Sequence, residues 1–232
     1  MAGTDTGVGK TEVATAILRH VRNAGGRPIP FKPVETGADP RPLDALRLYQ
    51  AAQPPVPPDR ICLYPLPLPA APQAAAERSG VSISAAGIRE RAADLAAAGD
   101  ALLVEAAGGL LVPYTPGLTG ADLAQLLGLP ILLVGRTALG TVNHMALSVN
   151  EVRRRGLVLH GLILSQTNPD HPPHEASNLP LIRQLTGIDP FGILPHVPGP
   201  TPATLATALA GALTRDALAR LVAPLAPRAG SF

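Results

Sequence analysis

The segment with the most recognisable chemistry is Gly3-Thr4-Asp5-Thr6-Gly7-Val8-Gly9-Lys10-Thr11, near the start of the chain. Glycines let backbone N–H groups turn toward an anion, and the helix expected from residue 10 adds the positive end of its dipole. Lys10 can then reach terminal phosphate oxygens, and the Thr11 hydroxyl can bind Mg²⁺. The usual motif has glycine at the position of Thr4. The segment predicts a nucleotide phosphate site, with a glycine-rich helix cap as the alternative.

Two further segments place charged side chains after expected strands. Lys32-Pro33-Val34-Glu35-Thr36-Gly37 follows a strand at 28–31, at the sheet edge where open α/β folds bind ligands. Lys32 could neutralise a developing anion and Thr36 could orient a substrate, although Lys32 alone reads as a solvated lysine. Glu105 ends a strand at 101–105 and is a candidate Mg²⁺ ligand, with a solvated strand-end carboxylate as the alternative. Asp44, near the start of a helix, complements the helix dipole.

Histidine and cysteine offer little further chemistry. His171-Pro172-Pro173-His174 lacks cysteine partners and is a weak metal candidate, and Glu175 reads as a first-turn helix acid. Cys62 stands among prolines and leucines, as an inert apolar filler. Because a lone cysteine makes no internal disulfide, a reducing cytoplasm is the expected compartment.

Apolar β-type runs alternate with helical patterns along the chain. Strands are expected at 28–31, 101–105, 130–134, 157–165 and 191–194. Helices are expected at 10–23, 43–52, 84–98, 121–127, 141–155, 175–185 and 202–221. The strands are nearly continuous Val/Ile/Leu/Ala runs, which predicts an α/β fold with a mostly parallel sheet and helices on both faces.

Two features complicate this pattern. Proline clusters at 53–72, 168–173 and 195–202 predict ordered loops or lids rather than sheet core. A phosphate loop normally follows a buried strand, yet only Met1 and Ala2 precede Gly3. We therefore expect residues 1–232 to form one domain whose first central strand, of about five residues, is missing or truncated.

Composition excludes several classes of protein. The 232 residues carry 19 Lys and Arg against 17 Asp and Glu, a formal charge of +2, which argues against a nucleic-acid site built on a basic stripe. The sequence has no run of 18 apolar residues and starts with no signal peptide, so we expect no membrane partner.

In combination, the motifs resemble those of the dethiobiotin synthetase family, P-loop NTPase-type enzymes of biotin synthesis. The matching segments are the loop at 3–11, Lys32-Pro33-Val34-Glu35-Thr36-Gly37, Asp44-Ala45, Val104-Glu105-Ala106-Ala107-Gly108-Gly109, Leu139-Gly140-Thr141-Val142-Asn143-His144 and Gly192-Ile193-Leu194-Pro195. Each is modest alone, but their joint order is specific and spans most of the chain.

The resemblance implies a cytoplasmic ligase that uses ATP and Mg²⁺. Its substrates would be 7,8-diaminononanoate and CO₂, joined through a carbamate and a carbamic-phosphoric mixed anhydride to give dethiobiotin, ADP and phosphate. The resemblance also implies a homodimer with the site near the subunit interface.

Site roles are likewise implied by the resemblance. Lys10 and Lys32 would be the catalytic lysines, and Thr11, Asp44 and Glu105 would hold Mg²⁺. The implied nucleotide site comprises Gly7, Val8, Gly9, Lys10, Thr11, Glu12, Asp44, Glu105, Ala106, Ala107, Gly108, Ser165, Gln166, Leu194, Pro195 and His196. The implied diamino-acid site comprises Thr6, Thr36, Leu139, Gly140 and Asn143.

The sequence departs from the family pattern at three places. Ala106 replaces a glycine, Gln73 stands where a Pro-His pair is usual, and Ser165-Gln166 falls where an adenine-reading Asn is common, which puts base preference in doubt. The alternative function is a ParA/MinD-type dimerising ATPase switch, but such proteins carry a signature lysine where this chain has Asp5. An amidoligase would need a glutaminase domain with a nucleophilic Cys, which Cys62 does not supply.

Overall fold

The computed structural model describes residues 1–170, 175 and 177–223. Seven parallel strands form the centre of the molecule, and an antiparallel hairpin of β5 (Pro113–Thr115) and β6 (Leu118–Thr119) lies outside them. One sheet has the order β1 (Ala2–Gly3), β7 (Ile131–Arg136), β8 (Leu159–Ser165) and β9 (Ile193–Leu194), and the other has β3 (Cys62–Leu66), β2 (Pro28–Thr36) and β4 (Ala101–Val104). The α/β prediction is confirmed.

Met1 joins the two sheets. Its amino group donates to Val104 O at 2.6 Å, and Ala106 N donates to Met1 O at 3.0 Å. Strand β1 therefore lies between β4 and β7, in the central position expected before the phosphate loop, but it is only two residues long.

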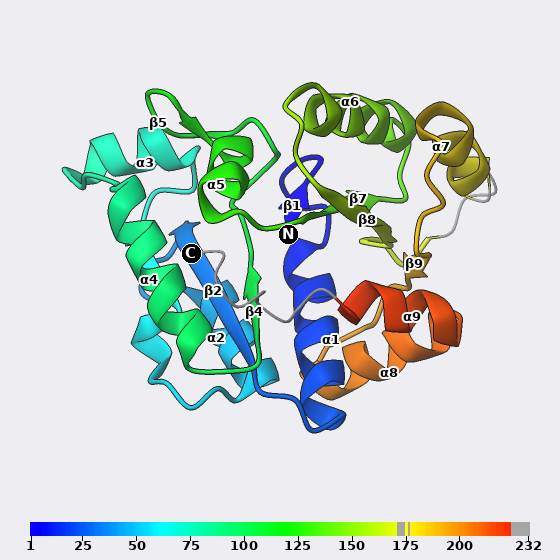
Figure 1. Ribbon diagram of the computed structural model, residues 1–232, viewed down its shortest axis with the longest axis horizontal. Helices are drawn as coiled ribbons and strands as arrows, with labels where there is room; N and C mark the ends of the chain where they lie inside the picture. Colours follow the sequence, from blue (N-terminus) through cyan, green and yellow to red (C-terminus); the bar gives the residue numbers. More distant parts are fainter. Residues whose placement is uncertain (171–174, 176, 224–232) are drawn as a thin grey trace.

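Helices cover both faces of the strands (Figure 1). One face carries α1 (Lys10–Asn23), α2 (Leu43–Ala52), α8 (Pro202–Ala212) and α9 (Arg215–Val222), and the other carries α4 (Ala85–Ala97), α5 (Gly120–Leu127), α6 (Thr141–Arg154) and α7 (Asn178–Thr186). The strands explain this arrangement, because alternate residues point to opposite faces. In β7, Leu132 and Val134 pack with α1 and α8, whereas Ile131 and Leu133 pack with α6.

Strand β2 carries three prolines although it lies between two partners. The backbone N–H of Lys32 donates to Ile61 O on the β3 side, and the carbonyl of Phe31 accepts from Glu105 N on the β4 side. The backbone polar groups of successive residues therefore alternate between the two sides. Pro28 and Pro30 face the β3 side before β3 begins, and Pro33 faces the β4 side after β4 has ended. Each missing N–H therefore falls where no partner strand needs it.

Several expected boundaries are wrong. The cluster at 53–72 was expected to be loop, but it contains the edge strand β3 and the start of α3 (Pro72–Ser79), after the short 3₁₀ turn η1 (Pro58–Arg60). An edge strand tolerates Pro65 because one side of its backbone pairs with no strand. The single helix expected at 202–221 is two helices, since Leu213 is extended and Thr214 caps α9.

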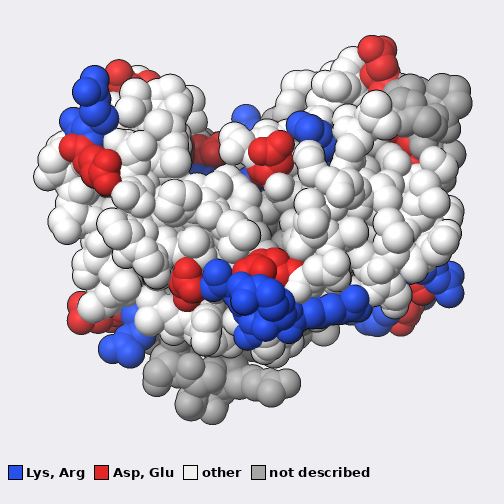
Figure 2. Space-filling model, turned by 90° about the horizontal axis from the view of Figure 1, so that it is seen from above, with Lys and Arg blue, Asp and Glu red and all other residues white. Residues whose placement is uncertain are grey.

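In the described part of the chain, no helix is long and apolar enough to cross a membrane. On the face seen in Figure 2, most of the surface is uncharged and the charged side chains form mixed groups of both signs. One of these groups lies in a hollow between two lobes of the surface.

Candidate active site

The loop before α1 has the backbone that its glycines predict. Gly7 and Gly9 have φ of 69° and 85°, the left-handed region that glycine adopts without strain. The Lys10 side chain is buried and turns back into the loop, where Nζ donates to Asp5 O at 3.0 Å. Gly9 lies against the end of β8 so closely that a Cβ there would overlap the Ser165 side chain. The loop is thus seated on Ser165.

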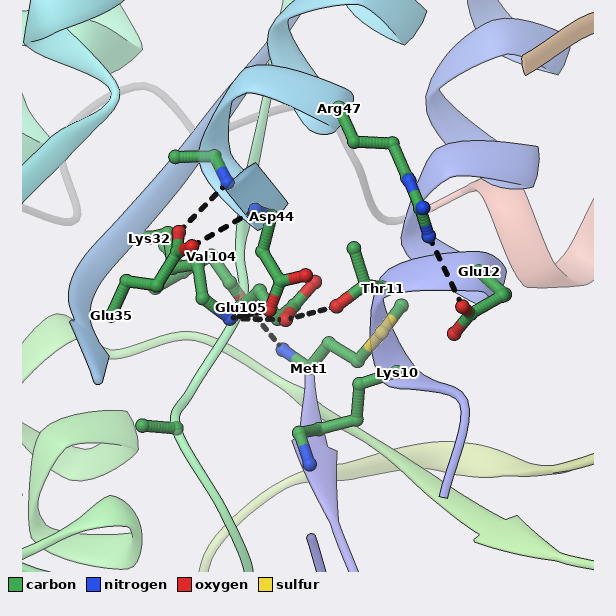
Figure 3. A network of polar contacts seen from close by, with 12 residues as sticks. Met1, Lys10, Thr11, Glu12, Lys32, Glu35, Asp44, Arg47, Val104 and Glu105 are labelled. Carbon is green, nitrogen blue, oxygen red and sulfur yellow. Dashed lines mark hydrogen bonds and ion pairs between the residues drawn. The ribbon is translucent and has the colours of Figure 1, made fainter. Parts of the chain in front are cut away.

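Four side chains from three elements and one loop meet beside this loop: Thr11, Lys32, Asp44 and Glu105, here named the lysine–carboxylate cluster (Figure 3). Lys32 Nζ lies 2.5 Å from Glu105 Oε1 and 3.3 Å from Asp44 Oδ2. The Thr11 hydroxyl donates to Glu105 Oε1 at 2.9 Å. Strand β2, the segment after β4, and the first turns of α1 and α2 bring these four side chains together.

The burial of this cluster corrects two sequence-based expectations. Lys32 was expected to follow its strand as an exposed lysine, but β2 continues to Thr36 and Lys32 is 4% exposed within it. Glu105 follows β4 and is fully buried, which contradicts the solvated alternative. Apolar packing around β2 and β4 removes water from both charges, so each depends on the other.

The two lysines differ electrostatically. Burial alone would lower the pKa of Lys32, but the charges of Glu105 and Asp44 outweigh it and hold the pKa above its ordinary value. For Lys10, burial prevails over the attraction of Glu105, and its pKa is lowered. The ion pairs therefore favour the protonated form of Lys32, whereas burial disfavours the protonated form of Lys10.

The cluster also fits a hard divalent cation. Glu105 Oε2 is buried without a hydrogen-bond partner among the described residues, and Asp44 and Thr11 offer further oxygens. Residues 1–170, 175 and 177–223 contain no group of three or more His, Cys, Asp or Glu that could hold a metal. Mg²⁺ matches such a sparse set, because it is usually held by one or two carboxylates together with substrate phosphates and water.

A pocket adjoins the loop on its β8 side. Its lining includes the predicted residues Gly7, Gly9, Glu12, Ser165, Gln166, Leu194, Pro195 and His196. Gln166 is oriented within it, since Oε1 accepts from His196 N at 3.3 Å and Nε2 donates to Glu175 Oε2 at 3.2 Å. Glu175 also accepts from the Thr137 hydroxyl and precedes α7, so its expected role as a first-turn helix acid is wrong.

The segment after β4 passes beneath the loop. Ala106 and Ala107 are buried, and Gly108 has a φ of 63°. The hydroxyl of the fully buried Tyr114 accepts from Ala107 N at 2.6 Å. Hairpin β5–β6 therefore anchors this segment.

The five residues predicted for the diamino acid are dispersed. Thr6 is exposed in the loop and Thr36 is half-buried at the end of β2. Leu139, Gly140 and Asn143 lie at the start of α6, where Leu139 is 83% exposed and Gly140 is the N-cap with φ of 93°. None of the contacts described for Lys32 and Glu105 includes Leu139, Gly140 or Asn143. Gln73, which departs from the family pattern, lies on α3 and its amide donates to Glu77.

Two site residues were not predicted. Arg136, at the end of β7, has Nη2 3.8 Å from Asp5 Oδ2 and could have been found from its place after the strand expected at 130–134. Glu35 is buried and its carboxylate bonds to the start of α2, a contact that no local sequence signal marks.

Cys62 is buried as expected, and burial raises its pKa to about 12. His171 and His174 lie outside the described residues.

Comparisons with known proteins place the chain among named relatives. A family described as an AAA domain matches residues 1–204. A protein of Anaeromyxobacter dehalogenans named ATP-dependent dethiobiotin synthetase BioD is 47% identical over 199 residues, covering 85% of this chain and 89% of its own. Proteins of the same name from Aromatoleum aromaticum and Halalkalibacterium halodurans are 38% and 35% identical, covering 90% and 85% of this chain and 95% and 84% of their own.

One solved structure extends the comparison to the fold. The MinC:MinD cell division protein complex of Aquifex aeolicus aligns with a TM-score of 0.62, covering 100% of this chain and 98% of its own at 13% identity. That similarity supports the single α/β fold with its mostly parallel sheet.

Proposed function

Because the chain belongs to the family of ATP-dependent dethiobiotin synthetases, we propose that it converts 7,8-diaminononanoate, CO₂ and ATP into dethiobiotin, ADP and phosphate. The enzyme is a ligase, as its relatives are. The observation that carries the proposal is the lysine–carboxylate cluster, in which a buried cation and two carboxylates lie beside a glycine-rich loop that also lines a pocket.

The reaction has three steps. One amine of the substrate attacks CO₂ and loses a proton, which gives a carbamate. A carbamate oxygen then attacks the terminal phosphorus of ATP, and ADP leaves. The second amine attacks the carbonyl carbon of the mixed anhydride and loses a proton, which closes the ureido ring and releases phosphate. Negative charge develops next to phosphate in each step, so positioned cations provide most of the stabilisation.

Residues of the cluster match these needs. Lys32 stays protonated, so it neutralises the carbamate and the transferring phosphoryl group rather than acting as a base. Lys10 binds the phosphates after leaving Asp5 O. Thr11, Asp44 and Glu105 would hold Mg²⁺, which supplies charge neutralisation on the phosphates when bound. Gly7, Val8 and Gly9 present backbone N–H groups, and Glu12, Ala106, Ala107 and Gly108 flank them.

The remaining site residues divide between the two substrates. Ser165, Gln166, Leu194, Pro195 and His196 surround the nucleotide base, and the anchored amide of Gln166 is the side chain that reads it. Thr6 and Thr36 bind the diamine, and Leu139, Gly140 and Asn143 receive its carboxylate at the start of α6. Leu139, Gly140 and Asn143 are exposed on one subunit, so we propose that a homodimer brings them to the lysine–carboxylate cluster of the partner subunit. We also propose that the enzyme works in the cytoplasm.

The test is incubation with 7,8-diaminononanoate, bicarbonate, Mg²⁺ and ATP, GTP or CTP in turn, with dethiobiotin detected by mass spectrometry. We expect dethiobiotin and phosphate in equal amounts, with both dependent on the diamine. Phosphate release without the diamine, and no dethiobiotin with it, would overturn the proposal and favour the ATPase switch.

A further inference from the structure

Helix α2 begins without a cap of its own. Its N-cap residue is Pro42, which has no side-chain hydrogen-bond group, and no side chain at that position accepts from the first turn. The first turn of any helix has backbone N–H groups that lack a partner within the helix. These groups need an acceptor from elsewhere in the chain.

Glu35 is that acceptor. One carboxylate oxygen accepts from Asp44 N and the other from Ala45 N, both at 2.9 Å (Figure 3). Asp44 and Ala45 are the second and third residues of α2, whose N–H groups an N-cap side chain normally binds. Glu35 is 5% exposed and lies on β2, so it ties the beginning of α2 to the sheet.

The same helix start carries a member of the lysine–carboxylate cluster. The Asp44 side chain is 44% exposed and forms an ion pair with Lys32 at 3.3 Å. Lys32 stands three residues before Glu35 on β2. Strand β2 therefore holds Asp44 twice, by the backbone through Glu35 and by the side chain through Lys32.

Each oxygen of Glu35 accepts a backbone N–H of α2 and the residue is 5% exposed, so its carboxylate faces the helix rather than solvent. The Asp44 side chain would be one holder of a divalent cation, and the Glu35 contacts fix its backbone whatever its side chain binds. We propose that Glu35 is a positioning residue that sets Asp44 for the divalent cation by capping α2. This inference rests on the proposed Mg²⁺-dependent function.

The experiment measures Mn²⁺, as a paramagnetic substitute for Mg²⁺, binding to the ADP-loaded protein by electron paramagnetic resonance. Glu35→Ala should weaken Mn²⁺ binding on the order of tenfold, as loss of an outer-shell partner typically does. Glu35→Gln keeps one acceptor and should weaken it less. Amide hydrogen exchange at Asp44 and Ala45 should be faster than in the wild-type protein in both variants, and fastest in Glu35→Ala.

The matched control is Thr214→Ala, which removes the side-chain cap of the remote helix α9. It should lower the melting temperature without changing Mn²⁺ affinity. The double variant Glu35→Ala/Asp44→Asn should bind Mn²⁺ no more weakly than Asp44→Asn alone, because Glu35 acts through Asp44.

Equal Mn²⁺ affinity in Glu35→Ala, Glu35→Gln and Thr214→Ala would overturn the inference, as would additive losses in the double variant. These readouts do not depend on dethiobiotin. A protein that shows the expected Mn²⁺ pattern but forms no dethiobiotin would refute the proposed reaction and support the role of Glu35.

Discussion

Lys32 and Glu105 lie on neighbouring parallel segments with their charged atoms 2.5 Å apart and with side chains only 5% and 1% exposed. Phe31, next to Lys32, accepts a hydrogen bond from Glu105 N, so the backbone of the two segments is joined at the same point. The lysine proposed for catalysis and the carboxylate proposed for the metal thus also form a buried ion pair of the sheet.

Loss of Lys32 should therefore affect folding as well as catalysis. Lys32→Met should abolish dethiobiotin formation and lower the free energy of unfolding by about 3 to 5 kcal/mol, because Glu105 is left buried and unpaired. Urea denaturation and product formation measure the two effects. Lys32→Met/Glu105→Gln should regain much of the stability without activity. An unchanged unfolding midpoint in Lys32→Met would contradict this expectation.

The close approach of Gly9 to Ser165 predicts a contrast between two glycines. Gly9→Ala and Gly7→Ala both place alanine at positive φ, which costs roughly 1 to 2 kcal/mol. Only at Gly9 does the new Cβ also overlap a neighbour, since nothing lies within 4 Å at Gly7. Gly9→Ala should therefore lower the melting temperature more, and Gly9→Ala/Ser165→Gly should recover part of the loss. Equal losses for the two single variants would show that Ser165 does not restrict the loop.

These residues show what the sequence could and could not predict. The loop, α1 and α2 were expected with the correct boundaries, because glycine spacing and helical periodicity are local signals. The burial of Lys32 was missed, because it depends on how far β2 continues beyond residue 31 and on what packs over it. The Glu35 contact was missed for the same reason, since two segments separated by a turn meet only after folding.

The proposed homodimer predicts that replacing an exposed leucine of its interface with a charged residue weakens association. Leu111 and Leu147 are 53% and 61% exposed and line one concavity that also includes Asp5 of the loop. Leu147→Asp should shift the protein toward a monomer in size-exclusion chromatography with light scattering and reduce turnover. Val158→Asp is the control, because Val158 is 68% exposed just before β8, at the opposite edge of the sheet from the loop. A monomeric wild-type protein with full activity would refute the shared site.

His160 should make the fold sensitive to mild acid. Burial lowers its pKa in the folded state, and neutral Nε2 donates to Leu221 O at 2.9 Å while the ring packs against Phe191. The unfolded chain then takes up a proton on His160 at higher pH than the folded chain does. The contribution of neutral His160 to stability is therefore fully present above about pH 6.5 and is lost as the pH falls below that value. Urea denaturation from pH 7.5 to 5.5 should show a shallower acid loss in His160→Gln. Parallel curves for the two proteins would exclude His160 as the cause.

The gap beside Met1 predicts that a longer first strand would stabilise the sheet. Ala2 pairs with Leu133, so β7 continues for two residues beyond the reach of β1, and a cavity there is lined by Met1, Leu102, Leu103 and Leu132. Burial also lowers the pKa of the Met1 amino group to about 6, which shows that a charge in this place is unfavourable.

An extension of five Val and Ile residues before Met1 should pair with β4 and β7, fill the cavity and replace the buried ammonium with a peptide N–H. We expect a higher melting temperature and slower amide exchange at Leu103 and Leu132. The matched control is a five-residue Gly-Ser extension, which replaces the ammonium but supplies no apolar side chains, and should therefore gain less. If the two extensions gave the same melting temperature, apolar strand pairing in this gap would not be the source of the stability.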